Sequence, residues 1–99
     1  MSDSPALPDD GEGLYDTFVA ASKCLETGQA TEAANLFSRI VIADPASRSA
    51  WEGLARARFD AQEFERAAQA FTRLVELAPD DDYAHFGLGL SLWRLRRFT

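Results

Sequence analysis

The chain has 99 residues, which corresponds to one small domain. Ten Lys and Arg residues against 16 Asp and Glu residues give a formal net charge of −6, and this acidity argues against non-specific nucleic-acid binding, which requires a basic surface. The single Cys excludes an internal disulfide, no apolar run approaches the roughly 20 residues of a membrane span, and the N-terminus lacks the pattern of a secretory signal. We therefore expect a cytoplasmic protein that binds neither nucleic acid nor membranes.

Residues 1–13 are predicted to form a disordered acidic leader. This segment contains two Pro, two Gly and four carboxylates, with no basic residue and little apolar surface. Such a composition does not provide enough apolar burial to offset the entropy lost on ordering the chain.

The two stretches that follow the leader match each other at an offset of 34 residues. They are residues 14–47 and 48–81, and residues 82–99 begin a third copy that stops half-way. A period of about 34 residues is typical of stacked units that cannot bury their apolar faces alone. The repeated residues include Ala33, Phe37, Arg39 and Pro45, which recur as Ala67, Phe71, Arg73 and Pro79.

Each full copy has the apolar spacing of two helices separated by turn signals. In the first copy, Gly28 is expected to end one helix and Pro45 to stop the next. The second copy repeats this cycle, with Ser47 or Ser49 as the N-cap of its first helix, although its turn at residues 60–63 contains no Gly.

A fifth helix is expected from about Tyr83 to Leu95. Three Asp residues at 80–82 offer an N-cap, and Arg94, Arg96 and Arg97 lie at the C-terminal end, where the helix dipole favours cations. No segment shows the spacing of a strand, so the sequence predicts an all-α fold.

The repeated residues resemble the tetratricopeptide-repeat signature. This resemblance implies a right-handed α-solenoid of antiparallel helix hairpins, with two full repeats plus a lone fifth helix. It also implies a concave groove, lined by the first helix of each repeat, that binds a peptide or partner protein. The signature residues are Trp51, Leu54, Ala55, Phe64, Ala67, Phe71 and Pro79, with Ala21, Gly28, Ala33, Phe37 and Pro45 in the weaker first copy and Leu88, Gly89 and Phe98 in the third.

One stripe of each first helix is predicted to face this groove, because its residues have i, i+4, i+7 spacing. A separate stripe is predicted to pack on the second helix of the same repeat: Ala20, Ala21 and Cys24, then Leu54 and Ala55, then Leu88, Gly89 and Leu92. The groove stripe comprises Phe18, Ser22 and Leu25, then Glu52, Arg56 and Phe59, then Phe86, Leu90 and Trp93.

We predict that the partner contacts Phe18, Ser22, Glu52, Arg56, Phe59, Tyr83, Phe86, Leu90 and Trp93. The alternative is that Phe18, Leu25 and Phe59 complete the core. Glu52 and Arg56 are expected to form a solvated i, i+4 pair, unless Arg56 receives a carboxylate of the partner.

The sequence indicates no catalytic, cofactor or metal site. His85 is the only His and has no second ligand at metal-binding spacing, and Cys24 has no indicated base and is interpreted as a small buried residue. The predicted function is therefore a non-catalytic interaction module. The alternative is a structural segment whose last helix, with Tyr83, Phe86, Leu90 and Trp93, packs on further repeats or on a second copy of the chain.

Overall fold

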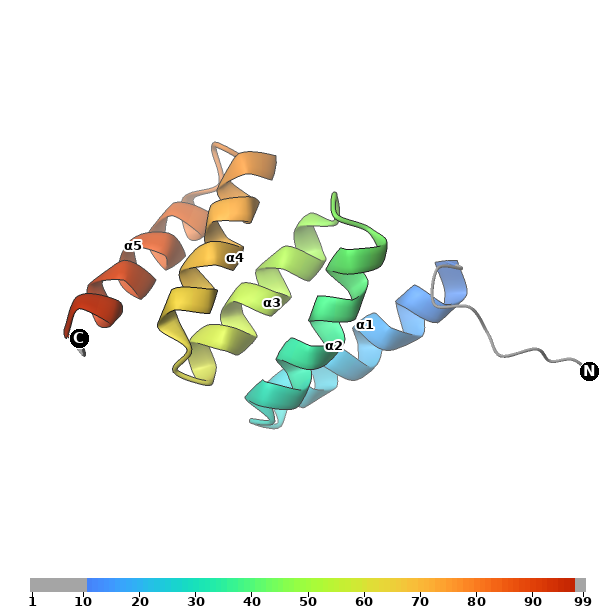
Figure 1. Ribbon diagram of the computed structural model, residues 1–99. Helices are drawn as coiled ribbons and strands as arrows, with labels where there is room; N and C mark the ends of the chain where they lie inside the picture. Colours follow the sequence, from blue (N-terminus) through green and yellow to red (C-terminus); the bar gives the residue numbers. More distant parts are fainter. Residues whose placement is uncertain (1–10, 98–99) are drawn as a thin grey trace, which may run out of the picture.

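Five helices make up most of the computed structural model, which describes residues 11–97 (Figure 1). Each helix packs on the next in chain order, and α3 also touches both α1 and α5. No strand occurs among these residues, and the stacked hairpins confirm the predicted α-solenoid. The helices are α1 (Gly11–Glu26), α2 (Ala30–Ala43), α3 (Arg48–Asp60), α4 (Phe64–Leu77) and α5 (Asp82–Arg97).

Two helix bounds differ from the expected ones. Helix α1 begins at Gly11, so residues 11–13 of the expected leader are helical, and residues 1–10 lie outside the described residues. Leu14 packs against the core, and this apolar contact outweighs the roughly 1 kcal/mol by which each Gly disfavours a helix. Helix α5 continues to Arg97, two residues beyond the expected end.

The turns within the two hairpins have the same backbone geometry. Gly28 ends α1 with a φ of 81°, and Gln62, at the equivalent position of the next repeat, has a φ of 64°. In both turns the residue that follows donates its backbone N–H to a carbonyl five residues back, Gln29 to Cys24 at 2.8 Å and Glu63 to Arg58 at 2.9 Å. The second turn thus keeps the geometry without a glycine.

The N-caps of α3 and α5 also repeat. The Ser47 hydroxyl accepts the Ala50 N–H at 3.2 Å, and the Asp81 carboxylate accepts the Ala84 N–H at 3.2 Å. Both contacts satisfy an N–H group that has no partner within its helix. Ser47, and not Ser49, is therefore the N-cap of α3.

Small residues line the contacts between helices, and large aromatics of the second helices fill the core. Ala21, Ala33, Ala55 and Ala67 are fully buried, as the repeat pattern predicts, and Phe37 and Phe71 are only 1% and 2% exposed. Burial of each ring contributes about 1.5–3 kcal/mol, so these two aromatics account for a large part of the stability of a domain this small.

The predicted packing stripe of α5 is correct only for Leu88, which is half-buried against the core. This helix is buried through Ala84, Gly87 and Ser91, which face α4, whereas Leu92 is 46% exposed and Gly89 is also exposed. The reason is that no helix among residues 11–97 covers the opposite side of α5. In α1, Ala20 is likewise exposed and Cys24 is half-buried, so only Ala21 of that predicted set is buried.

Candidate functional site

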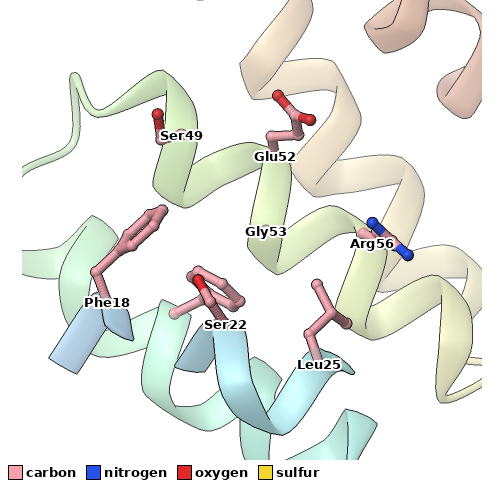
Figure 2. Close-up of a pocket in the computed structure, with 8 residues that line it drawn as sticks. Phe18, Ser22, Leu25, Ser49, Glu52, Gly53 and Arg56 are labelled. Atoms are coloured by element: carbon pink, nitrogen blue, oxygen red, sulfur yellow. The ribbon is translucent and has the colours of Figure 1, made fainter. Parts of the chain in front are cut away.

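Two adjacent pockets open along the first helices of the repeats, and we call them together the groove. The α1–α3 pocket has a volume of about 250 Å³ (Figure 2) and is lined by Phe18, Ser22, Leu25, Phe37, Ser49, Glu52, Gly53 and Arg56. The α3–α5 pocket has a volume of about 170 Å³ and is lined by Arg56, Phe59, Asp60, Phe71, Tyr83, Phe86, Gly87 and Leu90. Arg56 lines both.

The two pockets are the same site in successive repeats. Each residue of the α1–α3 pocket except Phe18 has its counterpart, one repeat later, in the α3–α5 pocket. The counterpart of Phe18 is Glu52, which does not line the second pocket, and Asp60 lines the second pocket only. The repeat period therefore reproduces a surface concavity as well as the helix packing.

The floor of each pocket is an aromatic ring that lies against a helical glycine. A Cβ atom added to Gly53 would overlap the Phe37 ring, and one added to Gly87 would overlap the Phe71 ring. On the other side, each floor ring makes an edge-to-face contact with an aromatic of the groove: Phe37 with Phe18 at 5.6 Å and Phe71 with Tyr83 at 5.9 Å between centroids.

The side chains around these floors differ between the two pockets. In the α1–α3 pocket, the positions hold Ser22, Leu25, Ser49, Glu52 and Arg56. Their counterparts in the α3–α5 pocket are Arg56, Phe59, Tyr83, Phe86 and Leu90. The α3–α5 pocket is thus mainly apolar, the α1–α3 pocket combines polar and apolar side chains, and Arg56 lies between them.

Three charges follow one another along α3 at the groove. Glu52, Arg56 and Asp60 are spaced one helical turn apart and are exposed, and none of their side chains forms a hydrogen bond or ion pair with a described residue. The expected Glu52–Arg56 pair is therefore absent, and in Figure 2 the Glu52 carboxylate and the Arg56 guanidinium do not meet. An exposed pair gains so little energy that the entropy of two long side chains can outweigh it.

The Tyr83 hydroxyl lies within electrostatic range of these charges. Burial raises the pKa of Tyr83, the Arg56 guanidinium lowers it, and the carboxylates of Glu52, Asp60 and Asp81 raise it further. The pKa is raised on balance from the ordinary value of 10.0. Tyr83 is thus influenced by one cation and three carboxylates.

The groove contains all but one of the nine predicted binding residues. Phe18 and Ser22 are half-buried in the α1–α3 pocket, while Tyr83 and Phe86 are 41% and 66% exposed in the α3–α5 pocket. Trp93 lies in neither of these pockets; it is 51% exposed and lines a shallow hollow with Arg96 and Arg97. The Arg97 guanidinium lies 5.1 Å from its ring centroid.

Sequence reasoning missed Ser49, Asp60 and the two floor glycines as groove residues. The signal that could have indicated the glycines is their occurrence inside two helices at equivalent positions of successive repeats, because glycine is costly there unless a neighbour needs the space. Nothing in the spacing of Asp60 distinguishes it from an ordinary helix-end carboxylate.

Phe59 lies between the groove and the interior. Its ring contacts Phe64 edge-to-face at 5.1 Å, and the Arg94 guanidinium lies 5.3 Å from the Phe59 centroid and 5.4 Å from that of Phe64. Arg94 was expected only to complement the helix dipole. Here it also joins the C-terminal end of α5 to the α3–α4 turn through cation–π contacts.

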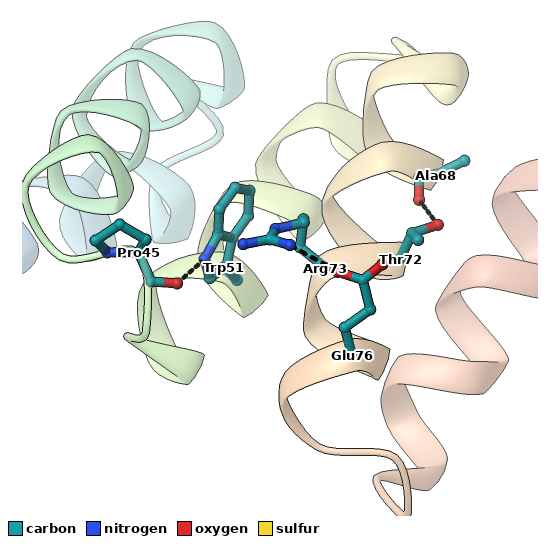
Figure 3. Close-up of polar contacts among 6 residues, drawn as sticks. All are labelled: Pro45, Trp51, Ala68, Thr72, Arg73 and Glu76. Carbon is teal, nitrogen blue, oxygen red and sulfur yellow. Dashed lines mark hydrogen bonds and ion pairs between the residues drawn. The ribbon is translucent and has the colours of Figure 1, made fainter.

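His85 forms a hydrogen bond to the preceding turn that is equivalent to one formed by Trp51 in the previous repeat. The Trp51 indole N–H donates to the Pro45 carbonyl at 2.7 Å (Figure 3), and the His85 Nε2 donates to the Pro79 carbonyl at 2.6 Å. The two pairs occupy equivalent positions of successive repeats, so His85 replaces Trp51 as a donor to the preceding turn. The Trp51 ring also lies 5.6 Å from the Arg73 guanidinium, which forms an ion pair with Glu76 at 2.7 Å.

Neither metal-binding nor membrane-spanning features occur in the described part of the chain. No group of three or more His, Cys, Asp or Glu side chains among residues 11–97 could hold a metal ion. None of the helices described is long and apolar enough to cross a membrane.

The stacked hairpins with a repeated pocket define a helical-repeat protein. A family model described as tetratricopeptide repeat matches residues 18–82 and again residues 53–99. The chain therefore belongs to the tetratricopeptide-repeat family, which confirms the resemblance noted in the sequence. No curated protein sequence matches the chain. Repeats of this family generally act as non-catalytic modules for protein–protein interaction or assembly.

Proposed function

We propose that this chain is an interaction module that binds a peptide or helix of a partner protein in the groove. The observation that supports this proposal is the row of two repeat-related pockets, whose rim carries exposed aromatic side chains. Phe86 is 66% exposed and Tyr83 is 41% exposed. Exposed apolar groups of this size, grouped around a hollow, commonly mark an interface.

Apolar burial would supply most of the affinity, and the charges of α3 would set the register of the ligand. Covering apolar surface contributes about 25 cal/mol per Å², and a buried aromatic anchor at the centre of an interface commonly contributes more than its neighbours. Glu52 and Arg56 have no ion-pair partner in the described structure, so a ligand can reach them without breaking an existing contact.

The test begins with the selection of ligands from a random displayed peptide library. The binding site of a selected peptide is then mapped by the changes it causes in the amide chemical shifts of the protein. We expect the shifts to concentrate in α1, α3 and α5, and we expect Arg56→Ala and Phe86→Ala to weaken binding without loss of helicity. Arg39→Ala and Ile42→Ala are matched controls, because both residues are exposed on α2 outside the groove. Shifts concentrated on α2 and α4, or unchanged binding by both groove variants, would contradict the proposal.

A second candidate function is assembly through the free side of α5. This face carries Gly89 and Leu92, which are both exposed, and a Cβ atom on Gly89 would meet no atom within 4 Å. The counterpart of Gly89 in α3 is Ala55, which is buried. Self-association through this face predicts a dimer in sedimentation velocity at tens of micromolar, and Leu92→Ser would return it to a monomer. A wild-type monomer at that concentration removes this candidate.

The cytoplasmic location expected from the single Cys is also part of the proposal. A reducing compartment keeps an unpaired thiol such as that of Cys24 in its reduced form. Fractionation of cells that express the chain, followed by detection with an antibody, tests this location.

A further inference from the structure

The groove carries more acid than base, although its second pocket is apolar. From this combination we propose that its ligand is a basic amphipathic segment. In this proposal, one large apolar side chain enters the α3–α5 pocket, and Lys or Arg side chains pair with Glu52 and Asp60. The inference rests on the proposed function of the groove and specifies the chemistry of its partner.

The α3–α5 pocket supplies the apolar anchor site. Phe71 forms its floor, and Phe59, Phe86 and Leu90 line its sides. Its volume of about 170 Å³ is close to that of apolar protein cavities of about 150 Å³ that hold a benzene molecule. The pocket therefore suits one Leu, Met or Phe side chain of a ligand.

The charges on the rim favour a basic ligand. Glu52 lies one helical turn before Arg56 and Asp60 one turn after it, so a ligand carboxylate that paired with Arg56 would lie close to two carboxylates. Asp81 adds to the negative field around Tyr83, and the whole chain has a net charge of −6. A cationic ligand is therefore attracted by the rim and by the protein as a whole.

Arg56 has a role that is consistent with this chemistry. It lines both pockets, and a guanidinium can donate hydrogen bonds to neutral acceptors such as backbone carbonyls as well as to carboxylates. In this proposal Arg56 holds the backbone of the ligand between the two pockets. The Ser22 and Ser49 hydroxyls of the α1–α3 pocket offer further neutral contacts.

The experiment uses a displayed peptide library in which acidic and basic residues are equally frequent. The expected result is enrichment of peptides that combine net positive charge with one large apolar residue. For the best peptide, Glu52→Gln and Asp60→Asn should each raise Kd about two- to five-fold at low salt and less at high salt. Glu65→Gln is the matched control, because Glu65 is an exposed carboxylate on α4 outside both pockets, and its Kd should equal that of the wild type.

Phe86→Ala separates the failure of this inference from the failure of the proposed function. Loss of the anchor site should raise Kd about ten-fold or more, with little dependence on salt. Enrichment of acidic peptides, or a Kd unchanged by Glu52→Gln and Asp60→Asn, would overturn the basic ligand, while sensitivity to Phe86→Ala would still support binding in the groove. A selection without any peptide sensitive to Phe86→Ala would overturn both.

Discussion

The aromatic ring of Phe37 occupies the space that a side chain on Gly53 would need. The same relationship joins Phe71 to Gly87, one repeat later. Each contact lies between the second helix of one repeat and the first helix of the next, so it sets how closely successive repeats approach. The same two rings form the floors of the groove pockets, so repeat packing and the shape of the candidate site depend on the same atoms.

Gly53→Ala and Gly87→Ala are expected to destabilise the domain. A methyl group at either position would overlap an aromatic ring whose side chain is almost completely buried. Overpacking of this kind costs about 1–3 kcal/mol, and the better helix propensity of Ala returns up to about 1 kcal/mol. We expect a net loss of about 1–2 kcal/mol for each variant in urea unfolding followed by circular dichroism.

Gly89→Ala is the matched control for these two variants. It lies in the same helix as Gly87, but a Cβ atom there would meet no atom within 4 Å. Only the propensity gain remains, so this variant should be more stable than the wild type by up to about 1 kcal/mol. Equal midpoints for Gly87→Ala and Gly89→Ala would show that the ring does not fill the space next to Gly87.

The repeat period allowed most of the fold to be predicted, because it aligns residues that have the same packing role. Gly28, Ser47 and Pro45 act locally, through a left-handed turn, an N-cap and a helix stop, and local roles can be inferred from sequence. The rotation of each helix about its own axis cannot be inferred from local sequence in this way, because it depends on how neighbouring helices cross. This is why Ala20 and Leu92 were assigned to buried faces and are exposed.

The candidate site was predicted less completely for the same reason. Helical spacing correctly placed Phe18, Arg56 and Phe86 on one side of their helices, but it could not indicate where that side ends. Trp93 lies on the expected stripe, two turns after Phe86, and falls outside both groove pockets. Gly53 and Gly87 were not predicted to line the groove, because a residue without a side chain does not contribute to an apolar pattern.

Gln62→Gly is expected to stabilise the α3–α4 turn. Gln62 has a φ of 64°, a left-handed conformation that costs non-glycine residues about 1–2 kcal/mol. Glycine removes this cost but adds entropy to the unfolded chain, which returns about 0.4–1 kcal/mol of the gain. The net effect should be an increase in unfolding free energy of about 0.5–1 kcal/mol, measured by urea titration.

Gly28→Ala provides the reverse test in the other hairpin. Gly28 has a φ of 81° and open space around its α carbon, so only backbone strain should matter. This variant should lose stability while Gln62→Gly gains it. Changes of the same sign would show that the two turns do not share the conformation described above.

Phe37→Ala and Phe71→Ala are expected to be severe core lesions. Each ring is almost fully buried, and truncation of a buried Phe to Ala costs about 3–5 kcal/mol. This is a large fraction of the stability of a small domain. Both variants should therefore be largely unfolded already at the start of a thermal melt. Ile42→Ala is the control, because Ile42 is 79% exposed on α2 and should melt as the wild type does. Near-normal melts for both Phe variants would refute the stacking of the repeats.

Tyr83 is expected to make the stability of the domain depend on pH in the alkaline range. Its pKa in the folded protein is raised above 10.0, mainly by burial, so the folded state holds the phenolic proton more tightly than the unfolded state. The stabilisation is fully present below about pH 10 and is lost as the pH rises through the raised pKa. Urea unfolding from about pH 8 to about pH 11 should show this loss, and Tyr83→Phe should reduce it.

An ultraviolet pH titration of the folded protein tests how close the groove charges lie to the Tyr83 hydroxyl. Subtracting the ultraviolet titration of Tyr83→Phe from that of the wild type isolates the Tyr83 phenol, whose midpoint should lie above 10.0. Because Arg56 lowers this pKa and Glu52 raises it, Arg56→Gln should shift the midpoint upward and Glu52→Gln downward. No response to either substitution would place the hydroxyl away from these charges, and a midpoint at or below 10.0 would show that burial does not dominate the pKa of Tyr83.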